Sequence, residues 1–217
     1  MTLKQHKLIA YLAIIAIWLI WLSDLAIDIR TMFDDGFWQP MANLQPWRIT
    51  FATFALFLFP LVSGGVYVLN KGLKKPLLSL LLFVIFSTVC IYMHSSYFFF
   101  AKASSYYTDT SGAEQAVIAG LLQEYNAFKN TFGAIFLISV LIASAWLLAV
   151  VAANKTVFPR YFALLNPLTG TVLGKSIHAL YPPLATMIYP VIIPAFWMAL
   201  LFTVYLLYLL KRPYLLD

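Results

Sequence analysis

Charged residues and cysteine are both scarce in this 217-residue chain. Only 10% of the residues are charged, whereas 63% are hydrophobic, and the mean hydropathy is +0.87. A soluble domain carries about 25% charged residues, so this composition excludes a soluble globular protein and indicates a polytopic membrane protein. At about 20 residues for each membrane helix, the chain has room for about six helices and none for a separate soluble domain.

The single cysteine, Cys90, lies within one of the predicted helices. One thiol cannot form a disulfide framework, a C-x-x-C redox pair or a zinc cluster within the chain, so we predict no metal and no cofactor. We interpret Cys90 as a small apolar core residue. The sequence also has no internal repeat of fixed period, which argues against an inverted-repeat transporter.

Six apolar segments of membrane-spanning length predict an all-α bundle that forms a single transmembrane domain over residues 1–217. The longest connection is polar and contains tyrosines at its start. It then carries apolar residues at helical spacing, which predicts an outer amphipathic helix over about residues 114–128. The predicted spans are residues 8–27, 49–69, 77–100, 131–153, 161–180 and 184–210.

The basic residues orient this bundle. With the N-terminus in the cytoplasm, nine of the fourteen basic residues fall on the inner side, as the positive-inside rule requires. Both termini are then cytoplasmic, and we expect the protein in the inner membrane of a bacterial cell. The net charge of +6 reflects this topology and not nucleic-acid binding. The inner basic residues are Lys4, Lys7, Lys71, Lys74, Lys75, Lys155, Arg160, Lys211 and Arg212.

Two carboxylates, Asp24 and Asp28, lie one helical turn apart at the end of the first span. A charged side chain at mid-membrane costs roughly 2.5–3.5 kcal/mol on insertion scales, so such residues usually mark a site, a relay or a paired structural contact. Asp28 can also lie at the interface, solvated or paired with Arg30. Asp24 is one turn deeper, shares a helix face with Trp21, and is the stronger candidate.

Other ionisable residues are predicted at the same depth, in the outer half of the bundle. His94 and Tyr97 belong to one stripe of the third span, and Lys175 and His178 lie near the outer end of the fifth. Each ionisable residue also has a structural interpretation: His94 as a neutral core histidine, Lys175 as a residue that snorkels to the surface, and His178 as part of the next loop. The aromatic Trp197, on the last span, can line an apolar pocket.

Small residues and prolines in three spans have architectural interpretations. Gly170-x-x-x-Gly174 matches the small-x-x-x-small pattern of close helix packing. Ser63-Gly64-Gly65 predicts a kink or a close neighbour in the second span. Asn166-Pro167 predicts an interruption of the fifth span, because proline removes a backbone donor.

Two short motifs surround the inner turn before the fifth span, Lys155-Thr156-Val157-Phe158-Pro159-Arg160 and Leu165-Asn166-Pro167. Together with a Tyr-x-x-His-like element near Tyr92 and a proline-rich start to the last span, they resemble an uncharacterised family of bacterial six-span membrane proteins. The resemblance implies the six-span fold and a part in the family's design for His94 and the Pro159-Arg160 turn. It implies no activity.

Three function classes remain open. The first is a membrane enzyme, such as a cyclase, isomerase or hydrolase, that acts on a lipidic or isoprenoid substrate. The second is a non-enzymatic ligand-binding, sensor or transport-accessory protein, and the third is a haem protein with His94 and His178 as axial ligands. Beyond membrane lipids, the sequence specifies no partner, substrate or oligomeric state. For the enzyme, the predicted acid–base residues are Asp24, Asp28 and His94, and the predicted substrate-binding residues are Trp21, Tyr97, Lys175, His178 and Trp197.

Overall fold

The structure, a computed structural model, describes residues 1–27, 42–73, 76–180 and 192–216. These residues form helices and no strands, which confirms the all-helical prediction for this part of the chain. The α-helices are α1 (Leu3–Ala26), α3 (Pro46–Phe54), α4 (Phe59–Leu73), α5 (Pro76–Asp109), α6 (Gly112–Ala152), α7 (Pro167–Leu180) and α9 (Ile192–Leu210), and the 3-10 helices are η2 (Ala55–Leu58), η3 (Arg160–Leu164) and η4 (Pro213–Leu215).

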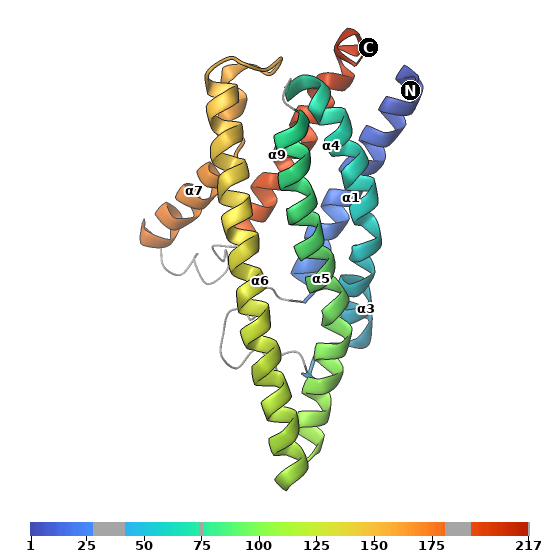
Figure 1. Cartoon of the computed structure of the whole chain (residues 1–217), viewed down its shortest axis with the longest axis vertical. Coiled ribbons are helices and arrows are strands. Elements are labelled where there is room, and N and C mark those ends of the chain that lie inside the picture. The colour runs from blue at the N-terminus through green and yellow to red at the C-terminus, as the bar shows by residue number, and fades with distance from the viewer. Residues whose placement is uncertain (28–41, 74–75, 181–191, 217) are drawn as a thin grey trace.

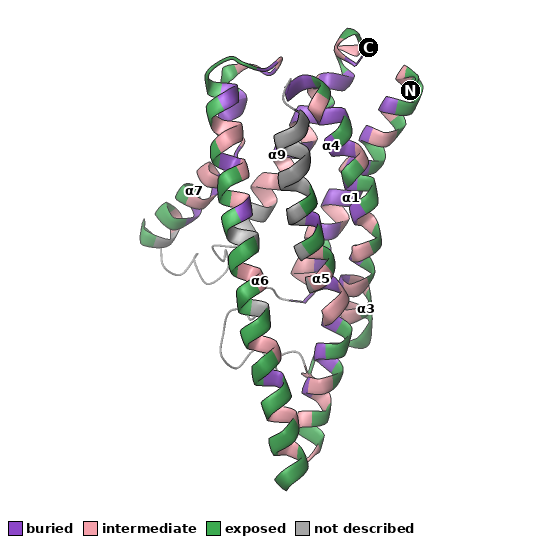
Figure 2. Cartoon of the chain, in the orientation of Figure 1, coloured by how far each residue is buried: buried purple, intermediate pink, exposed green. Residues whose placement is uncertain are grey.

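The helices form an elongated bundle (Figure 1). Helix α1 packs against α4 and α9, α5 packs against α3, α4 and α6, and α7 packs against α6 and α9. Both chain termini lie at one end of the bundle, which we call the terminal end. The opposite end, where α1 ends at Ala26 and α3 begins at Pro46, is called the distal end. Buried residues gather where α1, α4 and α9 meet, whereas much of α6 is exposed (Figure 2).

Three of the described helical segments are long and apolar enough to cross a membrane. They overlap the first, second and fourth predicted spans. The count of six spans and the cytoplasmic placement of the termini stay predictions, and the first residues of the predicted sixth span lie outside the described residues. The three segments are Leu3–Ala26, Pro46–Leu73 and Gly112–Ala152.

The second of these segments tightens at its centre. Helices α3 and α4 are joined by the 3-10 turn η2, so that residues 46–73 are helical throughout. Pro60 has no N–H to donate to the carbonyl of Leu56, and its ring crowds that carbonyl, which explains a local change in winding. The irregularity therefore follows from a proline, and it lies before the Ser63-Gly64-Gly65 stretch at which a kink was predicted.

Helix α5 is longer than the predicted third span. It continues past Phe100 to Asp109, and only Thr110 and Ser111 separate it from α6. The hydroxyls that give this stretch its polar character bond within the helix, for example from Ser104 Oγ to the Phe100 carbonyl at 2.8 Å. Because such bonds satisfy the hydroxyls locally, a stretch that resembles a loop in composition is helical.

Helix α6 combines the predicted amphipathic helix and the predicted fourth span. It contains 41 residues, which corresponds to about 60 Å at 1.5 Å for each residue. A membrane's hydrocarbon core is about 30 Å thick. The hairpin of α5 and α6, formed by residues 100–128, therefore extends beyond the rest of the bundle at the distal end (Figure 1).

The predicted fifth span, residues 161–180, is not one helix. It contains the turn η3 and then α7, which has 14 residues and is therefore about 21 Å long. Pro167 begins α7, and the Asn166 side-chain oxygen accepts a hydrogen bond from the Leu168 N–H at 2.9 Å. The Asn166-Pro167 pair thus interrupts the segment as its chemistry predicts, and α7 is too short to span the hydrocarbon core on its own.

Glycines allow close approach at two helix contacts. A Cβ atom on Gly65 of α4 would lie 2.5 Å from both Ala13 of α1 and Phe202 of α9. A Cβ atom on Gly170 of α7 would lie 2.8 Å from the Trp197 side chain of α9. In both places only a hydrogen fits, so these glycines serve packing.

The terminal end is closed by aromatic residues. Phe158 is 1% exposed, and its ring centroid lies 4.3 Å from that of Tyr205. The Tyr205 hydroxyl donates to the Phe162 carbonyl at 3.0 Å, and the Tyr208 hydroxyl donates to the Val157 carbonyl at 3.2 Å. The Tyr208 bond satisfies the Val157 carbonyl, and the Tyr205 bond adds to the one that the Phe162 carbonyl accepts from the Leu165 N–H at 2.9 Å, so both tyrosines tie the irregular segment to α9.

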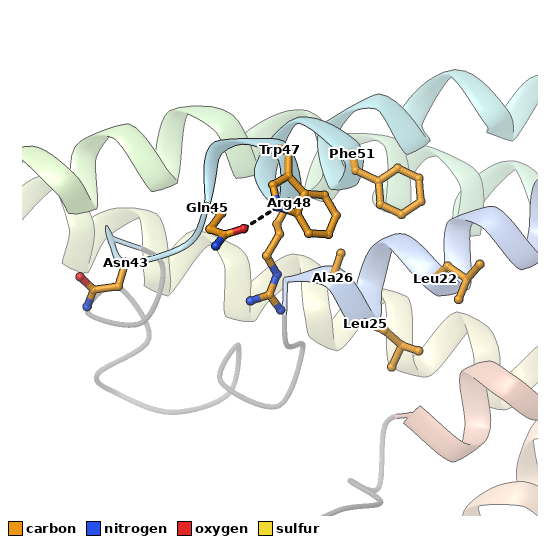
Figure 3. A pocket seen from close by; sticks show the side chains of 8 residues that line it. All are labelled: Leu22, Leu25, Ala26, Asn43, Gln45, Trp47, Arg48 and Phe51. Carbon is orange, nitrogen blue, oxygen red and sulfur yellow. Dashed lines mark hydrogen bonds between the residues drawn. The ribbon is translucent and has the colours of Figure 1, made fainter.

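The distal end contains a groove of about 710 Å³. One wall is the last turn of α1, with Leu22, Leu25 and Ala26, and the other is the start of α3, with Arg48 and Phe51 (Figure 3). It therefore lies where two helical segments of membrane-spanning length end.

Candidate functional site

Asp24 lies in the last turn of α1 and faces the bundle. Its helix neighbours Ile20, Ser23 and Ile27 are buried, and the Asp24 side chain is 20% exposed. The Ser23 hydroxyl donates to the Ile20 carbonyl at 2.6 Å. Ser23 is thus satisfied within its own helix, and Asp24 is the ionisable group that the last turn of α1 presents to its neighbours.

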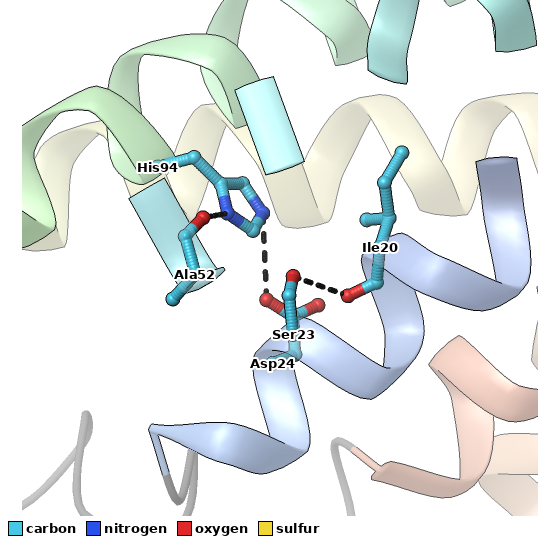
Figure 4. Close-up of polar contacts among 5 residues, drawn as sticks. All are labelled: Ile20, Ser23, Asp24, Ala52 and His94. Atoms are coloured by element: carbon cyan, nitrogen blue, oxygen red, sulfur yellow. Dashed lines mark hydrogen bonds and ion pairs between the residues drawn. The ribbon is translucent and has the colours of Figure 1, made fainter. Parts of the chain in front are cut away.

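His94, in the middle of α5, lies opposite Asp24. Its Nε2 atom is 3.4 Å from Asp24 Oδ1, and the imidazole is 5% exposed. Its Nδ1 atom is 2.7 Å from the main-chain carbonyl oxygen of Ala52 in α3. Figure 4 shows the ring held between these two oxygens, so one histidine connects α1, α3 and α5.

The Ala52 contact fixes the position of one imidazole proton. A carbonyl oxygen only accepts, so His94 Nδ1 carries a hydrogen. The Nε2 atom then faces Asp24 either as a donor, opposite a carboxylate, or as an acceptor, opposite a carboxylic acid. In either arrangement a single proton shared by the two side chains would leave the pair without net charge. A neutral pair avoids most of the cost of an isolated charge in an apolar bundle.

Aromatic rings fix the orientation of the imidazole. The Tyr97 ring, one turn further along α5, meets it edge to face with a centroid distance of 5.1 Å. The Phe59 ring of α4 lies 5.7 Å away. These contacts leave His94 little rotational freedom, so the direction of Nε2 toward Asp24 is set by packing as well as by hydrogen bonding.

Two buried polar atoms belong to residues near the pair in sequence. Trp21 Nε1 in α1 and Thr53 Oγ1 in α3 have no hydrogen-bond partner in the described part of the chain. Trp21 lies three residues before Asp24, and Thr53 follows Ala52. Unsatisfied buried donors are rare in proteins. Two of the three helices that the pair connects, α1 and α3, therefore each carry a buried donor that could bond a ligand.

Trp21 and Trp197, two other predicted site residues, make contacts outside the pair. Trp21 packs on Trp18 and Phe196, with ring distances of 5.7 and 5.6 Å. The Trp197 indole packs on Gly170 and donates to the Leu164 carbonyl at 3.0 Å. Lys175 is exposed on α7.

The predicted convergence is therefore limited to the residues of three helices. Because α7 packs against α6 and α9, the structure does not bring Lys175 to Asp24 and His94. Asp28 and the side chain of His178 lie outside what the structure describes.

Comparison with known protein families gives a match that includes all the residues of the site. A family of unknown function (DUF6796) matches residues 1–212. The chain belongs to DUF6796. No curated protein and no solved structure matches it. The match agrees with the sequence resemblance to an uncharacterised family, and it assigns no activity to this DUF6796 member.

Sequence reasoning missed groups at the Asp24–His94 pair of this DUF6796 chain and in the separate groove at the distal end. The Ala52 carbonyl is a main-chain atom, so no residue type announces its role. Phe59 was one of many aromatic residues in an apolar span. Arg48 and its neighbour Trp47 lie at the start of a membrane-length segment, where tryptophan and arginine commonly mark the interface, and this signal could have indicated the groove.

Proposed function

We propose that this DUF6796 chain is an integral protein of the cell membrane in which Asp24 exchanges a proton with a lipidic or isoprenoid molecule. The observation that carries the proposal is the Asp24–His94 pair, in which both imidazole nitrogens already have partners. A general acid or base must reach its substrate directly or through one water. Asp24, with its second carboxylate oxygen, is therefore the reacting group, and His94 is a positioning residue.

The pair suits reactions that remove one proton and return one. With Asp24 as a carboxylate, its free oxygen accepts a proton from the substrate while His94 balances the charge of the carboxylate. The same carboxyl group then returns the proton to another atom, and the pair regains its starting state. An isomerisation of a double bond has this balance and uses groups that the chain supplies. We therefore favour an isomerase-type reaction over a hydrolysis.

A second candidate, a non-enzymatic ligand-binding, sensor or transport-accessory protein, is favoured by a different observation. Neither Asp24 nor His94 lines the groove at the distal end. In this alternative the pair connects three helices and performs no chemistry. This alternative does not include a continuous polar route through the bundle for a transported ligand. The Ser63 hydroxyl and the Asn166 amide, which could have lined such a route, each bond a main-chain carbonyl.

The haem alternative has less support. An axial histidine ligand must offer an imidazole nitrogen to iron, and the nitrogens of His94 contact Ala52 and Asp24. Binding iron would break one of these contacts.

The test compares lipid extracts from cells that lack the protein with cells that express the wild type or a variant. Asp24→Asn removes proton exchange and keeps the size of the side chain. We expect the Asp24→Asn extract to match that of cells without the protein, with one lipid accumulated and another depleted, as measured by mass spectrometry. His94→Gln should reduce conversion and shift its pH dependence.

The control is Asp109→Asn, which changes an exposed carboxylate on the α5–α6 hairpin and should leave the wild-type lipid profile. Identical extracts from wild-type cells, Asp24→Asn cells and cells without the protein contradict the enzyme. If Asp24→Asn also lowers the unfolding temperature in that case, the helix-connecting role is the better account.

A further inference from the structure

The groove between α1 and α3 is separate from the Asp24–His94 pair. Leu22 and Ala26 lie two positions before and after Asp24, so they project from the opposite side of an α-helix. Leu22 is 45% exposed, whereas Ser23 is fully buried. The groove thus opens on the outer face of α1, and its occupant does not need to touch Asp24.

The groove is lined by apolar side chains from both helices and by polar side chains near the start of α3. Leu22 and Leu25 of α1 and Phe51 of α3 supply apolar surface, while Arg48 and Gln45 stand at the first turn of α3 (Figure 3). The groove, of about 710 Å³, is wide open to its surroundings. Such a groove fits an amphiphile, with its head at α3 and its hydrocarbon along α1.

The positive charge of Arg48 favours an anionic head group. No acidic side chain pairs with Arg48 among the residues that the structure describes. A guanidinium binds phosphate with two parallel hydrogen bonds. Gln45 can add a donor, because its side-chain oxygen already accepts from the Trp47 indole at 2.6 Å and its amide nitrogen points elsewhere. The first turn of α3 therefore offers positive charge and donors without an acidic group of its own.

The depth of the groove matches the level of a lipid head group. Helix α1 ends at Ala26 and the segment Pro46–Leu73 begins at Pro46, and both are long enough to cross a membrane. Trp47 is 60% exposed beside the groove, and tryptophan is enriched at membrane–water interfaces. The phosphate of a phospholipid lies at this boundary, directly above its acyl chains.

We propose that the groove is a binding site for an anionic phospholipid. The phosphate contacts Arg48 and Gln45, and one acyl chain lies against Leu22, Leu25 and Phe51. The site is independent of proton exchange at Asp24, and it holds a lipid in a fixed place beside α1.

Native mass spectrometry of the full-length protein tests this proposal. The protein is purified in detergent and incubated with phosphatidylglycerol or phosphatidylcholine of the same acyl chains. We expect one phosphatidylglycerol to stay bound to the wild type, with at least about five-fold greater occupancy than phosphatidylcholine, because arginine binds the anionic lipid at a partly buried site. Arg48→Gln should reduce phosphatidylglycerol to the level of phosphatidylcholine.

Two further variants make the result specific. Arg48→Lys keeps the charge without the planar fork and should retain an intermediate amount of phosphatidylglycerol. Arg160→Gln removes an exposed arginine at the terminal end and should bind like the wild type. Equal retention of the two lipids by the wild type, or equal retention of phosphatidylglycerol by the wild type and a folded Arg48→Gln protein, overturns the proposal. If Arg48→Gln does not fold, the Arg48→Lys and wild-type comparisons decide.

Discussion

At the terminal end, the side chains of Asn166, Tyr205 and Tyr208 bond main-chain atoms and hold an irregular segment against α9 and α6. At the distal end, by contrast, His94 bonds one main-chain carbonyl and faces a carboxylate, and Trp21 Nε1 is buried without a hydrogen-bond partner in the described part of the chain. The first arrangement uses polar groups to complete packing. The second retains an ionisable pair and unused polar capacity, as functional sites commonly do. Changes at the terminal end should therefore mainly affect stability, and changes at the distal end should mainly affect activity.

The largest stability effect is expected at the terminal end from Phe158→Ala. Phe158 packs on Phe162, Tyr205 and the Gly72 backbone, and a Phe→Ala change in a core costs about 3–5 kcal/mol. Thermal unfolding in detergent should show a correspondingly large fall in midpoint. Phe99→Ala is the control, because Phe99 is 73% exposed, and it should change stability by no more than about 0.5 kcal/mol. Equal effects from both variants would mean that the aromatic cluster does not close this end.

At the distal end, a double-mutant cycle measures the coupling of the pair. We expect Asp24→Asn and His94→Ala to be coupled by about 1–3 kcal/mol in free energy of unfolding, because each residue is the other's charge partner. Denaturant unfolding of the wild type, both single variants and the double variant provides the value. Additive losses would show that the 3.4 Å contact contributes no stability.

A loss of similar size is expected from Asn166→Ala at the terminal end. The Asn166 amide donates to the Ser144 carbonyl at 2.9 Å, and its oxygen accepts from Leu168. Removing the side chain deletes both bonds and leaves the Leu168 N–H in the first turn of α7 unsatisfied, at a cost of about 1–3 kcal/mol. The exposed Asn130 offers the matched control, Asn130→Ala. The comparison of the two ends predicts that Asn166→Ala leaves lipid profiles unchanged in cells that still contain folded protein.

The smallest effect distinguishes two neighbouring tryptophans. Trp18 Nε1 donates to Thr203 Oγ1 at 2.9 Å, whereas Trp21 Nε1 has no partner among the described residues. Interhelical hydrogen bonds in membrane proteins average about 0.6 kcal/mol. Trp18→Phe should therefore destabilise the protein by about that much more than Trp21→Phe, as measured in the same unfolding assay. The reverse order would indicate that Trp21 makes the stronger polar contact.

Sequence reasoning predicted the helical class from composition and placed Asp24 and His94 at one depth by counting along two helices. The structure brings these two side chains together. Lys175 was predicted at a similar depth, but depth along a helix does not determine which helices are neighbours, and α7 packs on the other side of the bundle. The sequence pattern also could not predict that the Ala52 carbonyl contacts His94, because every residue has a main-chain carbonyl. The groove forms where the end of α1 approaches the start of α3. The spacing of apolar residues within one helix does not predict how two helix ends approach each other.

The length of α6 has a mechanical consequence. One uninterrupted helix of 41 residues reaches from the α5–α6 hairpin to the packed segment at the terminal end. A tilt of about 5° at Ala152 would displace the opposite tip by about 5 Å, given a rise of 1.5 Å for each residue. Such a displacement is about one helical turn, and because α5 packs along α6, the two helices of the hairpin would have to move together.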